Sequence, residues 1–244
     1  MNRVPVIQRI VKKFLRRNGL DLVRYSPASH PLARRARLIS TYKINVVLDV
    51  GANIGQYGRQ LRELGYRGQL ISFEPLTVAY AELEKVAQAD HAWQTMNVAL
   101  GNTEGSFVLN ISGNSQSSSL CEILKEHEVA APNSKVVGKE VVAVKTLDSL
   151  FDKLCSDNDR ILLKIDTQGF EKHVLEGADR ALGYIQTLQI EMSLVSLYRN
   201  EILLPQMVEW LALKGFQLVA LEPGFANANT GQLLQVDGMF RRSS

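Results

Sequence analysis

An apolar run that ends in a glycine-rich turn is the feature of this sequence that most restricts its fold. The run is VVLDVGANIG, from Val46 to Gly55, and the acid Glu74 follows a second apolar run nineteen residues after Gly55. Glycines allow a sharp turn and bring bare backbone close to a ligand, because no Cβ stands in the way. A strand that enters a helix through such a turn is typical of an open α/β sheet. We therefore expect a buried parallel strand over Val46–Val50 and a helix that ends near Leu64.

The same alternation continues along the chain and predicts an α/β domain with helices on both faces of a mostly parallel sheet. The next expected strands are Leu70–Phe73, Gln94–Leu100, Leu162–Ile165 and Leu188–Met192. The expected helices are Val78–Gln88, Phe170–Leu182 and Leu204–Leu213. The last two strands, Gln217–Leu221 and Leu233–Phe240, flank a turn-rich segment, so we expect them to pair antiparallel.

The regular alternation is interrupted in the region 101–160. Two expected strands, Phe107–Ile111 and Val141–Lys145, flank the polar tract SGNSQSSS at Ser112–Ser119. A tract of serine and glycine cannot form part of a core, so it is either a linker or a lid. Because it leaves the sheet after the third strand, beside the expected ligand edge, we favour a lid.

Residues 1–43 form a basic arm ahead of the expected domain at residues 44–244. The arm holds eleven Lys or Arg and a single acid, Asp21. Its apolar side chains recur at helical spacing and predict a basic amphipathic helix within residues 1 to about 25: Val4, Ile7, Val11, Phe14 and Leu15. Such a helix could lie on an anionic membrane or touch nucleic acid. We favour packing on the acidic body of the domain or on a second subunit, because apolar stripes are usually packing surfaces.

The remaining composition excludes several classes of protein. No apolar span is long enough to cross a membrane, and the hydrophobic region of a secretory signal is missing. Cys121 and Cys155 are too few for a disulfide framework, and no Cys or His pair has zinc spacing. We therefore expect a cytoplasmic protein, with peripheral contact to the inner membrane through the arm as the alternative.

The glycine turn and the acid after it together indicate a nucleoside cofactor. Glu74 would accept hydrogen bonds from both ribose hydroxyls, and the helix after Gly55 would point its free N–H groups at the ligand. The middle glycine of a dinucleotide fingerprint, which makes room for a pyrophosphate, is absent. Asp49 would repel a phosphate but suit a cationic sulfonium. S-adenosylmethionine therefore fits better than a nicotinamide dinucleotide, with Asp49, Gly51, Asn53, Gly55 and Glu74 as its binding residues.

Charged residues inside two otherwise apolar strands indicate the reaction site. LLKIDTQGFE contains Lys164 and Asp166, and LQIEMS contains Glu191. A buried unpaired charge is costly, so these residues must be paired or lie at the open strand ends, where ligands bind in α/β sheets. Asp166 is the first candidate for the catalytic carboxylate and Glu191 the second. Lys164 is either a catalytic residue or half of a buried ion pair that links two strands.

Several segments together resemble the FkbM family of S-adenosylmethionine-dependent methyltransferases. They are DVGANIG, FEP, the segment Asn97–Gly101, TLDSL and KIDTQGFEKHVLEGA, within a stretch from about Ile44 to Arg241. The resemblance implies a Rossmann-like fold with a seven-stranded, mostly parallel sheet and a C-terminal antiparallel hairpin. It adds Asn97 and Ala99 to the cofactor-binding residues. It also implies methyl transfer to a hydroxyl oxygen of a sugar, glycan or secondary metabolite.

One residue departs from the family pattern. Many members read K-I-D-x-E-G where this chain has Gln168, which removes one candidate carboxylate. If that carboxylate acts as a base or metal ligand, its role must fall to Asp166, Glu171 or Glu191, or be absent. A carboxylate base and a divalent cation both remain open, and no metal ligands are assigned.

Three alternative functions remain at this point. A nicotinamide-dependent oxidoreductase would share the first strand–helix–strand unit, and a catalytically silent scaffold would keep the fold. A nucleic-acid methyltransferase is supported only by the charge of the arm. Few aromatic residues are interleaved with that charge at stacking spacing, so we expect no nucleic-acid partner.

Overall fold

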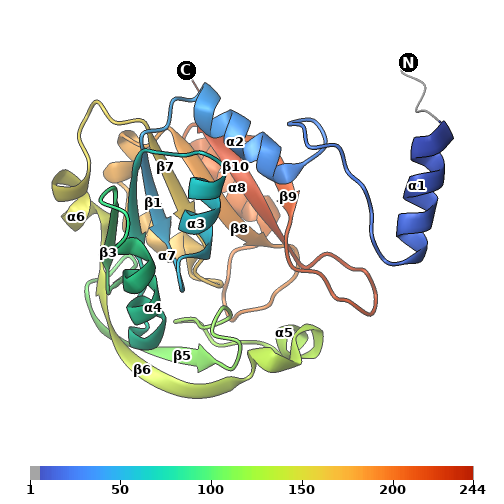
Figure 1. Ribbon diagram of the computed structural model, residues 1–244. Helices are drawn as coiled ribbons and strands as arrows, with labels where there is room; N and C mark the ends of the chain where they lie inside the picture. The colour runs from blue at the N-terminus through green and yellow to red at the C-terminus, as the bar shows by residue number, and fades with distance from the viewer. Residues whose placement is uncertain (1–5, 244) are drawn as a thin grey trace.

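The computed structural model describes residues 6–243, with the backbone alone for residues 6–8. Its centre is a seven-stranded sheet in the order β3-β2-β1-β7-β8-β10-β9 (Figure 1). The strands are β1 (Val46–Val50), β2 (Gln69–Phe73), β3 (Trp93–Met96), β7 (Ile161–Ile165), β8 (Thr187–Ser193), β9 (Phe216–Pro223) and β10 (Gln235–Arg242). The first five are parallel, and β10 pairs antiparallel with β8 and β9. The predicted Rossmann-like fold with a C-terminal antiparallel hairpin is confirmed.

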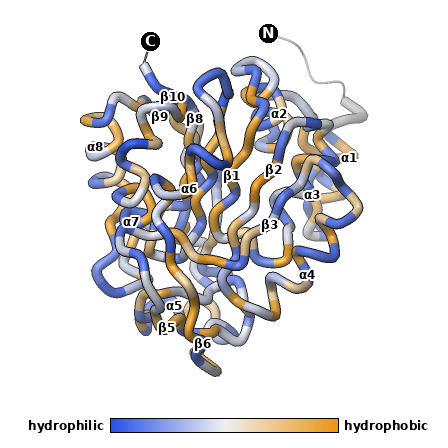
Figure 2. The backbone as a smooth tube through the Cα atoms, turned by 90° about the vertical axis from the view of Figure 1, so that its left-hand side faces the viewer, coloured by the Kyte–Doolittle hydropathy of each residue, from blue (hydrophilic) through white to orange (hydrophobic). Residues whose placement is uncertain are grey.

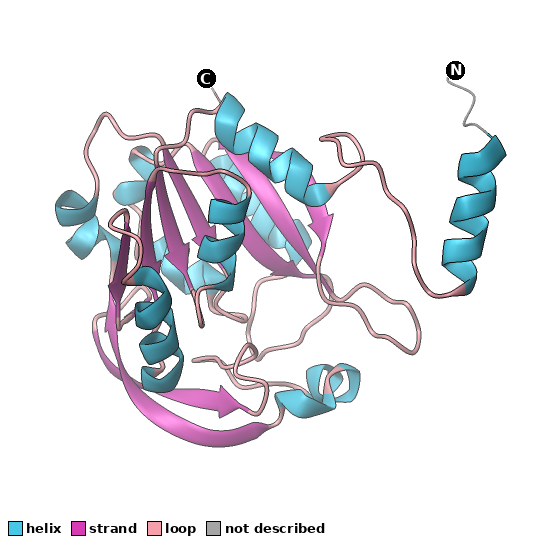
Figure 3. Cartoon of the chain, viewed as in Figure 1, coloured by secondary structure: helices cyan, strands magenta, loops and turns pink. Residues whose placement is uncertain are grey.

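Helices cover both faces of this sheet, because successive strand residues point to opposite sides and both sides are apolar (Figures 2 and 3). One face is covered by α2 (Pro31–Thr41), α3 (Gln56–Glu63) and α4 (Thr77–Ala87), and the other by α6 (Leu147–Leu154), α7 (Glu171–Glu176) and α8 (Leu204–Leu213). β1 is buried along its whole length. Val47 packs in the core beneath α2, α3 and α4, and Leu48 packs in the core beneath α6, α7 and α8. Asp49 therefore faces the layer of α2, α3 and α4.

The region 101–160 contributes most of a second, smaller sheet. Its strands, in the order β4-β6-β5, are β4 (Ala99–Leu100), β5 (Gly105–Ser112) and β6 (Val136–Lys145). The chain between β5 and β6 holds the polar tract, α5 (Lys125–Ala130) and the short 3-10 helix η1 (Pro132–Ser134). Leu109 and Val142 of this sheet form a small core with Leu76 and Ala79. The second sheet therefore packs against the start of α4 in the main domain.

Two predicted elements differ from the structure. The strand expected over Gln94–Leu100 is divided, because the Asn97 side chain donates hydrogen bonds to the carbonyls of Glu74 and Pro75 at 2.9 and 3.0 Å, and the chain turns there. The helix expected over Phe170–Leu182 ends at Glu176. Gly177 then packs against the backbone of Gly101, and the chain continues through the 3-10 helix η2 (Ala181–Gly183).

The arm forms the predicted helix near its start, but this helix does not bury its apolar side chains on the body, whereas α2 at the end of the arm packs on the sheet. Helix α1 (Val6–Arg17) stands apart from the sheet in Figure 1, and Ile10 and Phe14 are 64% and 66% exposed. The expectation that this helix packs on its own domain is wrong, because α2 covers the sheet face and buries Ile39 there. Val4 and the side chain of Ile7 lie outside the described residues. Among the described helices, none is long and apolar enough to span a membrane.

Candidate functional site

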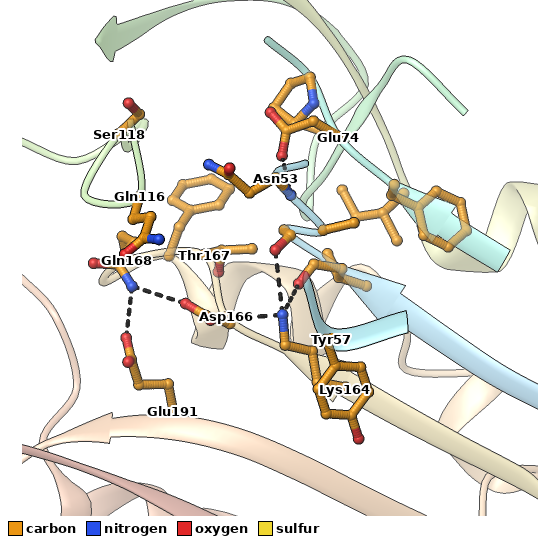
Figure 4. Close-up of a pocket in the computed structure, with 18 of the residues that line it drawn as sticks. Asn53, Tyr57, Glu74, Gln116, Ser118, Lys164, Asp166, Thr167, Gln168 and Glu191 are labelled. Carbon is orange, nitrogen blue, oxygen red and sulfur yellow. Dashed lines mark hydrogen bonds and ion pairs between the residues drawn. The ribbon is translucent and has the colours of Figure 1, made fainter. Parts of the chain in front are cut away.

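A cavity of about 380 Å³ lies at the carboxyl ends of β1, β2, β7 and β8, where open α/β sheets bind their ligands. Its walls include the glycine turn after β1, Glu74 after β2, and Asp166 and Glu191 (Figure 4). The polar tract supplies a further wall through Ser115, Gln116, Ser118 and Ser119. The candidate residues from distant parts of the sequence therefore meet at one site.

The cofactor half of the cavity is built around the Glu74 carboxylate. One oxygen accepts the backbone N–H of Asn53 at 2.8 Å, and the other accepts the N–H of Leu76 at 2.9 Å. Asn53 has a left-handed backbone (φ 48°), which points its N–H at this carboxylate. Burial raises the pKa of Glu74 to about 7, against the effect of the two N–H groups. The contact between Glu74 and the ribose hydroxyls stays a prediction, and the ionised carboxylate is the better acceptor for it.

The other predicted cofactor residues fall into two groups. Gly51 and Ala99 line the cavity, as do Asn53 and Glu74. Asp49, Gly55 and Asn97 lie behind the wall: Asp49 is fully buried in β1, Gly55 packs on Leu83 and Trp93, and Asn97 holds the turn after β2. Asp49 therefore does not line the cavity, and its predicted effect on a cationic sulfonium stays a prediction.

Gly51 joins the two halves of the site. Its φ is +76°, and a Cβ added there would lie 1.9 Å from the carbonyl oxygen of Asp166. The first turn and the end of β7 therefore touch through bare backbone, a closeness that only glycine permits. This contact places Asp166 beside the cofactor turn.

The acceptor half of the cavity contains the two predicted catalytic carboxylates. The Asp166 side chain is 35% exposed to the cavity, while Glu191 is largely buried on β8. The Gln168 side chain lies between them: its Nε2 donates to Asp166 Oδ1 at 2.8 Å and to Glu191 Oε2 at 2.7 Å. Burial first, and then the charges of Asp166, Glu171 and Asp237, raise the pKa of Glu191 well above its usual value.

Lys164 forms the buried ion pair that was one of its two expected roles. Its Nζ lies 3.1 Å from Asp49 on the neighbouring strand and 3.5 Å from Asp166, and it donates to the carbonyl of Gly51 at 3.2 Å. Burial alone would lower the pKa of Lys164, but the two carboxylates outweigh it and hold the pKa above its usual value. Lys164 therefore stays charged and links β1, the glycine turn and the end of β7 beneath the cavity. A direct catalytic role for it stays a prediction.

Several site residues were not identified from the sequence. Tyr198, from the loop after β8, donates from its hydroxyl to Gln168 Oε1 at 2.5 Å, and Gln235 of β10 donates to Glu191 at 2.8 Å. Arg35 of α2 is buried in the cavity wall and pairs with Glu222 of β9 at 2.5 Å. No local pattern marks these residues, because each reaches the site through strand order or helix packing.

The cavity suits a cationic adenosine ligand. Acidic side chains outnumber cations among the lining residues, so a positive charge in the ligand complements the cavity. The acids are Glu74, Asp166, Glu191 and Asp237, and the cations are Arg35 and Lys164. Apolar side chains at the turn after β2 and at β4, including Leu76 and Val98, offer a surface for a purine. Within residues 6–243, no group of three or more His, Cys, Asp or Glu side chains is arranged to hold a metal ion.

Known proteins resemble the chain in both sequence and fold. The model of the FkbM methyltransferase domain matches residues 49–218. No curated protein matches the chain. Among solved structures, a 1,6-didemethyltoxoflavin-N1-methyltransferase from Burkholderia thailandensis shares 11% identity and a TM-score of 0.48, with 87% of this chain and 78% of that chain covered.

Two further solved structures are similar at the same level. An rRNA methylase from Streptococcus thermophilus has 9% identity and a TM-score of 0.48, covering 88% of this chain and 98% of its own. A putative tRNA (m1A22) methyltransferase from Streptococcus pneumoniae, in complex with S-adenosyl-L-methionine, has 14% identity and a TM-score of 0.45, covering 86% and 73%. The family match extends over more than half of the sequence and spans the glycine turn, Glu74, Asp166 and Glu191. The chain therefore belongs to the FkbM family of S-adenosylmethionine-dependent methyltransferases.

Proposed function

We propose that this methyltransferase transfers the methyl group to a hydroxyl oxygen of a sugar, glycan or secondary metabolite, with Asp166 as the proton acceptor. The observation that carries the proposal is the Asp166 carboxylate. It is one-third exposed in the cavity, next to the cofactor turn, and paired through Gln168 with a second carboxylate. Glu191 is the second candidate for the proton acceptor.

The reaction needs an acceptor held in line and relieved of its proton. When bound, S-adenosylmethionine supplies an electrophilic methyl carbon whose bond to sulfur breaks as the new O–CH₃ bond forms. Asp166 accepts the hydroxyl proton, a contribution of roughly 10²–10⁴-fold for a well-placed general base. The Lys164 ammonium lies 3.5 Å from the Asp166 carboxylate and helps to hold it in place. Holding the two reactants in line contributes on the order of 7–11 kcal/mol.

The walls of the acceptor half support a hydroxyl-rich ligand. The polar tract lines the cavity with Ser115, Gln116 and Ser118, and Gln189 and Asp237 line it from the sheet. These groups both donate and accept hydrogen bonds, as sugar hydroxyls require. The tract is hydrogen-bonded to the loop between β7 and α7, because Ser119 Oγ donates to the Gln168 carbonyl at 2.6 Å. It therefore serves as the lid over the acceptor.

Isotope labelling tests the choice of acceptor. Cell extract is incubated with the protein and S-adenosylmethionine that carries a deuterated methyl group, and glycan, small-molecule, lipid and RNA fractions are analysed by mass spectrometry. We expect the label on an oxygen of a sugar or small metabolite, and none with Asp166→Asn. Label on RNA, or on a nitrogen, would overturn the proposal while leaving the family assignment intact.

We also propose that helix α1 contacts an anionic lipid surface. Exposed Ile10, Val11 and Phe14 lie on one side of the helix, and the opposite side carries five basic residues: Arg9, Lys12, Lys13, Arg16 and Arg17. A helix with this division can bury its apolar side at the headgroup boundary while its cations meet anionic lipids. The exposed residues Leu20, Leu22 and Val23 extend the apolar surface beyond the helix.

Vesicle binding separates this contact from a subunit interface. We expect full-length protein to bind vesicles containing phosphatidylglycerol, with affinity falling steeply as salt rises, and not to bind phosphatidylcholine vesicles. Phe14→Glu should abolish binding, whereas Val129→Glu, at an equally exposed position on the body, should not. If removal of residues 1–25 instead converts a dimer to a monomer in sedimentation, the helix is a subunit contact and the lipid proposal fails.

A further inference from the structure

The Gln168 side chain forms three hydrogen bonds within the site, none of which the sequence indicated. Its amide nitrogen donates to both candidate carboxylates (Figure 4). Its amide oxygen accepts the hydroxyl of Tyr198. Its backbone has a φ of +58°, and the Gln168 carbonyl accepts Ser119 of the lid. A left-handed backbone at a residue other than glycine is uncommon and is found where the surroundings fix it.

The orientation of this amide is fixed by its partners. Tyr198 reaches Oε1 with a hydroxyl that can donate, while Asp166 and ionised Glu191 can only accept. Turning the amide over would place its oxygen against the two carboxylates and remove the donor that they share. The NH₂ group must therefore face the carboxylates, and each of its hydrogens serves one of them.

Without this group the two carboxylates would face each other unshielded. Glu191 is half-buried, and its pKa is raised first by the loss of solvent and then by the nearby acids. The titratable groups that face it come from several elements: Asp166 and Lys164 at the end of β7, Glu171 of α7, Asp237 of β10, and Tyr198 in the loop after β8. Gln235 supplies a second donor to the same Glu191 oxygen at 2.8 Å. The neutral amide of Gln168 is the donor that joins this pair.

We propose that Gln168 is a positioning residue that holds Asp166 and Glu191 together in the place where a divalent cation would otherwise bridge them. Its Nε2 lies 2.8 and 2.7 Å from the two carboxylate oxygens, close to the position of a shared metal ion. A glutamate at this position would bring three carboxylates to one point, an arrangement suited to Mg²⁺ or Mn²⁺. This proposal rests on the proposed role of Asp166 as proton acceptor.

The test uses free Mn²⁺ and the full-length protein, so it needs no acceptor. Wild type, Gln168→Glu and Gln60→Glu are titrated with Mn²⁺ by electron paramagnetic resonance. Gln60 is the matched control, because it lines the same cavity but its oxygen accepts from Arg35 at 2.5 Å, away from the carboxylate pair. We expect Gln168→Glu alone to bind one Mn²⁺, with a Kd below about 1 mM.

Thermal melting at several pH values supplies the second readout. The carboxyl introduced by Gln168→Glu would lie beside two other acids, so its pKa should be higher in the folded protein than in the unfolded chain. Such a group makes the folded protein less stable as pH rises through the raised pKa. The variant should therefore melt near wild type at about pH 5 and about 4 °C or more below it at about pH 8. Added Mn²⁺ should restore the loss. Gln168→Ala, which adds no charge, should also lose stability increasingly as pH rises, because the carboxylates lose their shared donor.

Three results would contradict the proposal. The first is Mn²⁺ binding by wild type that Asp166→Asn abolishes, since a cation would then already bridge the pair. The second is a Gln168→Glu protein that binds no Mn²⁺ and melts like wild type at every pH. The third is a Gln168→Ala protein as stable as wild type at about pH 8. Calorimetry with S-adenosylhomocysteine is run in parallel: failure of wild type to bind it would discard the proposed function separately.

Discussion

The cofactor half and the acceptor half of this cavity each hold a glutamate, buried in Glu74 and half-buried in Glu191, but different kinds of group donate hydrogen bonds to the two carboxylates. Glu74 is bonded by backbone N–H groups of Asn53 and Leu76, both in loops at its own end of the sheet. Glu191 is bonded by the side-chain amides of Gln168 and Gln235, which come from other elements. Burial raises the pKa of both carboxyls.

This difference separates what the fold fixes from what substitution can change. Backbone donors remain whatever side chain the residue carries, so any sequence that forms the same turn supplies them. Side-chain donors disappear with a single substitution. The cofactor half is therefore set by backbone geometry, and the acceptor half is the part of the site where chemistry and specificity can diverge within one fold.

The largest expected effect concerns Gly51, where the two halves touch. Gly51→Ala should lower the free energy of unfolding by about 3 kcal/mol or more, because it combines a left-handed backbone with a clash against the Asp166 carbonyl. Gly65→Ala has a similar φ of +88° but meets nothing within 4 Å, so it should cost only about 1–2 kcal/mol. Urea denaturation measures both, and equal losses would show that the contact between the halves does not matter.

Removing the charge from the acceptor half should affect chemistry alone. Asp166→Asn should reduce single-turnover methyl transfer to the labelled acceptor by ~10²-fold or more, because the hydroxyl loses its proton acceptor. The Kd for S-adenosylhomocysteine should change little, since this carboxylate lies outside the Glu74 turn. Turnover within a factor of a few of wild type would transfer the role to Glu191.

Removing the acid from the cofactor half should weaken cofactor binding, which Asp166→Asn should leave nearly unchanged. Glu74→Ala should weaken S-adenosylhomocysteine binding by roughly 10- to 100-fold, because the ribose hydroxyls lose a charged acceptor. Glu74→Gln keeps one acceptor oxygen and should lie between the two. Isothermal titration calorimetry measures the Kd for S-adenosylhomocysteine in wild type and both variants. An unchanged Kd in Glu74→Ala would show that the region around Glu74 does not bind the cofactor.

The smallest expected effect is a pH dependence of cofactor binding. The pKa of Glu74 is raised to about 7, so its ionised fraction, the better hydrogen-bond acceptor, grows as pH rises through this value. Affinity for S-adenosylhomocysteine should therefore increase by up to about tenfold from about pH 6 to about pH 8, with protons released on binding. Calorimetry in buffers of different ionisation enthalpy detects that release. Glu74→Gln should show no such increase, which assigns the effect to this residue.

Much of the fold and half of the site followed from local patterns. Alternation of apolar residues and the glycine turn predicted β1, the parallel sheet and the antiparallel hairpin of β9 and β10, all of which the structure contains. The rule that ligands bind at the carboxyl ends of strands brought Glu74, Asp166 and Glu191 to one cavity. These predictions succeed because strand period and turn geometry depend on residues only a few positions apart.

The tertiary structure decided which side chains these residues meet. Asp49 looked like a cofactor contact, but strand order places Lys164 beside it and closes it off from the cavity. Gln168 looked like a lost carboxylate, but Asp166, Glu191 and Tyr198 converge on its amide. Helix α1 has the pattern of a packing helix, yet α2 covers the sheet face in its place. Each outcome depends on partners supplied by other elements, which the spacing of residues along the chain does not contain, whereas the turn around Gly51 and the position of Glu74 were fixed by the sequence alone.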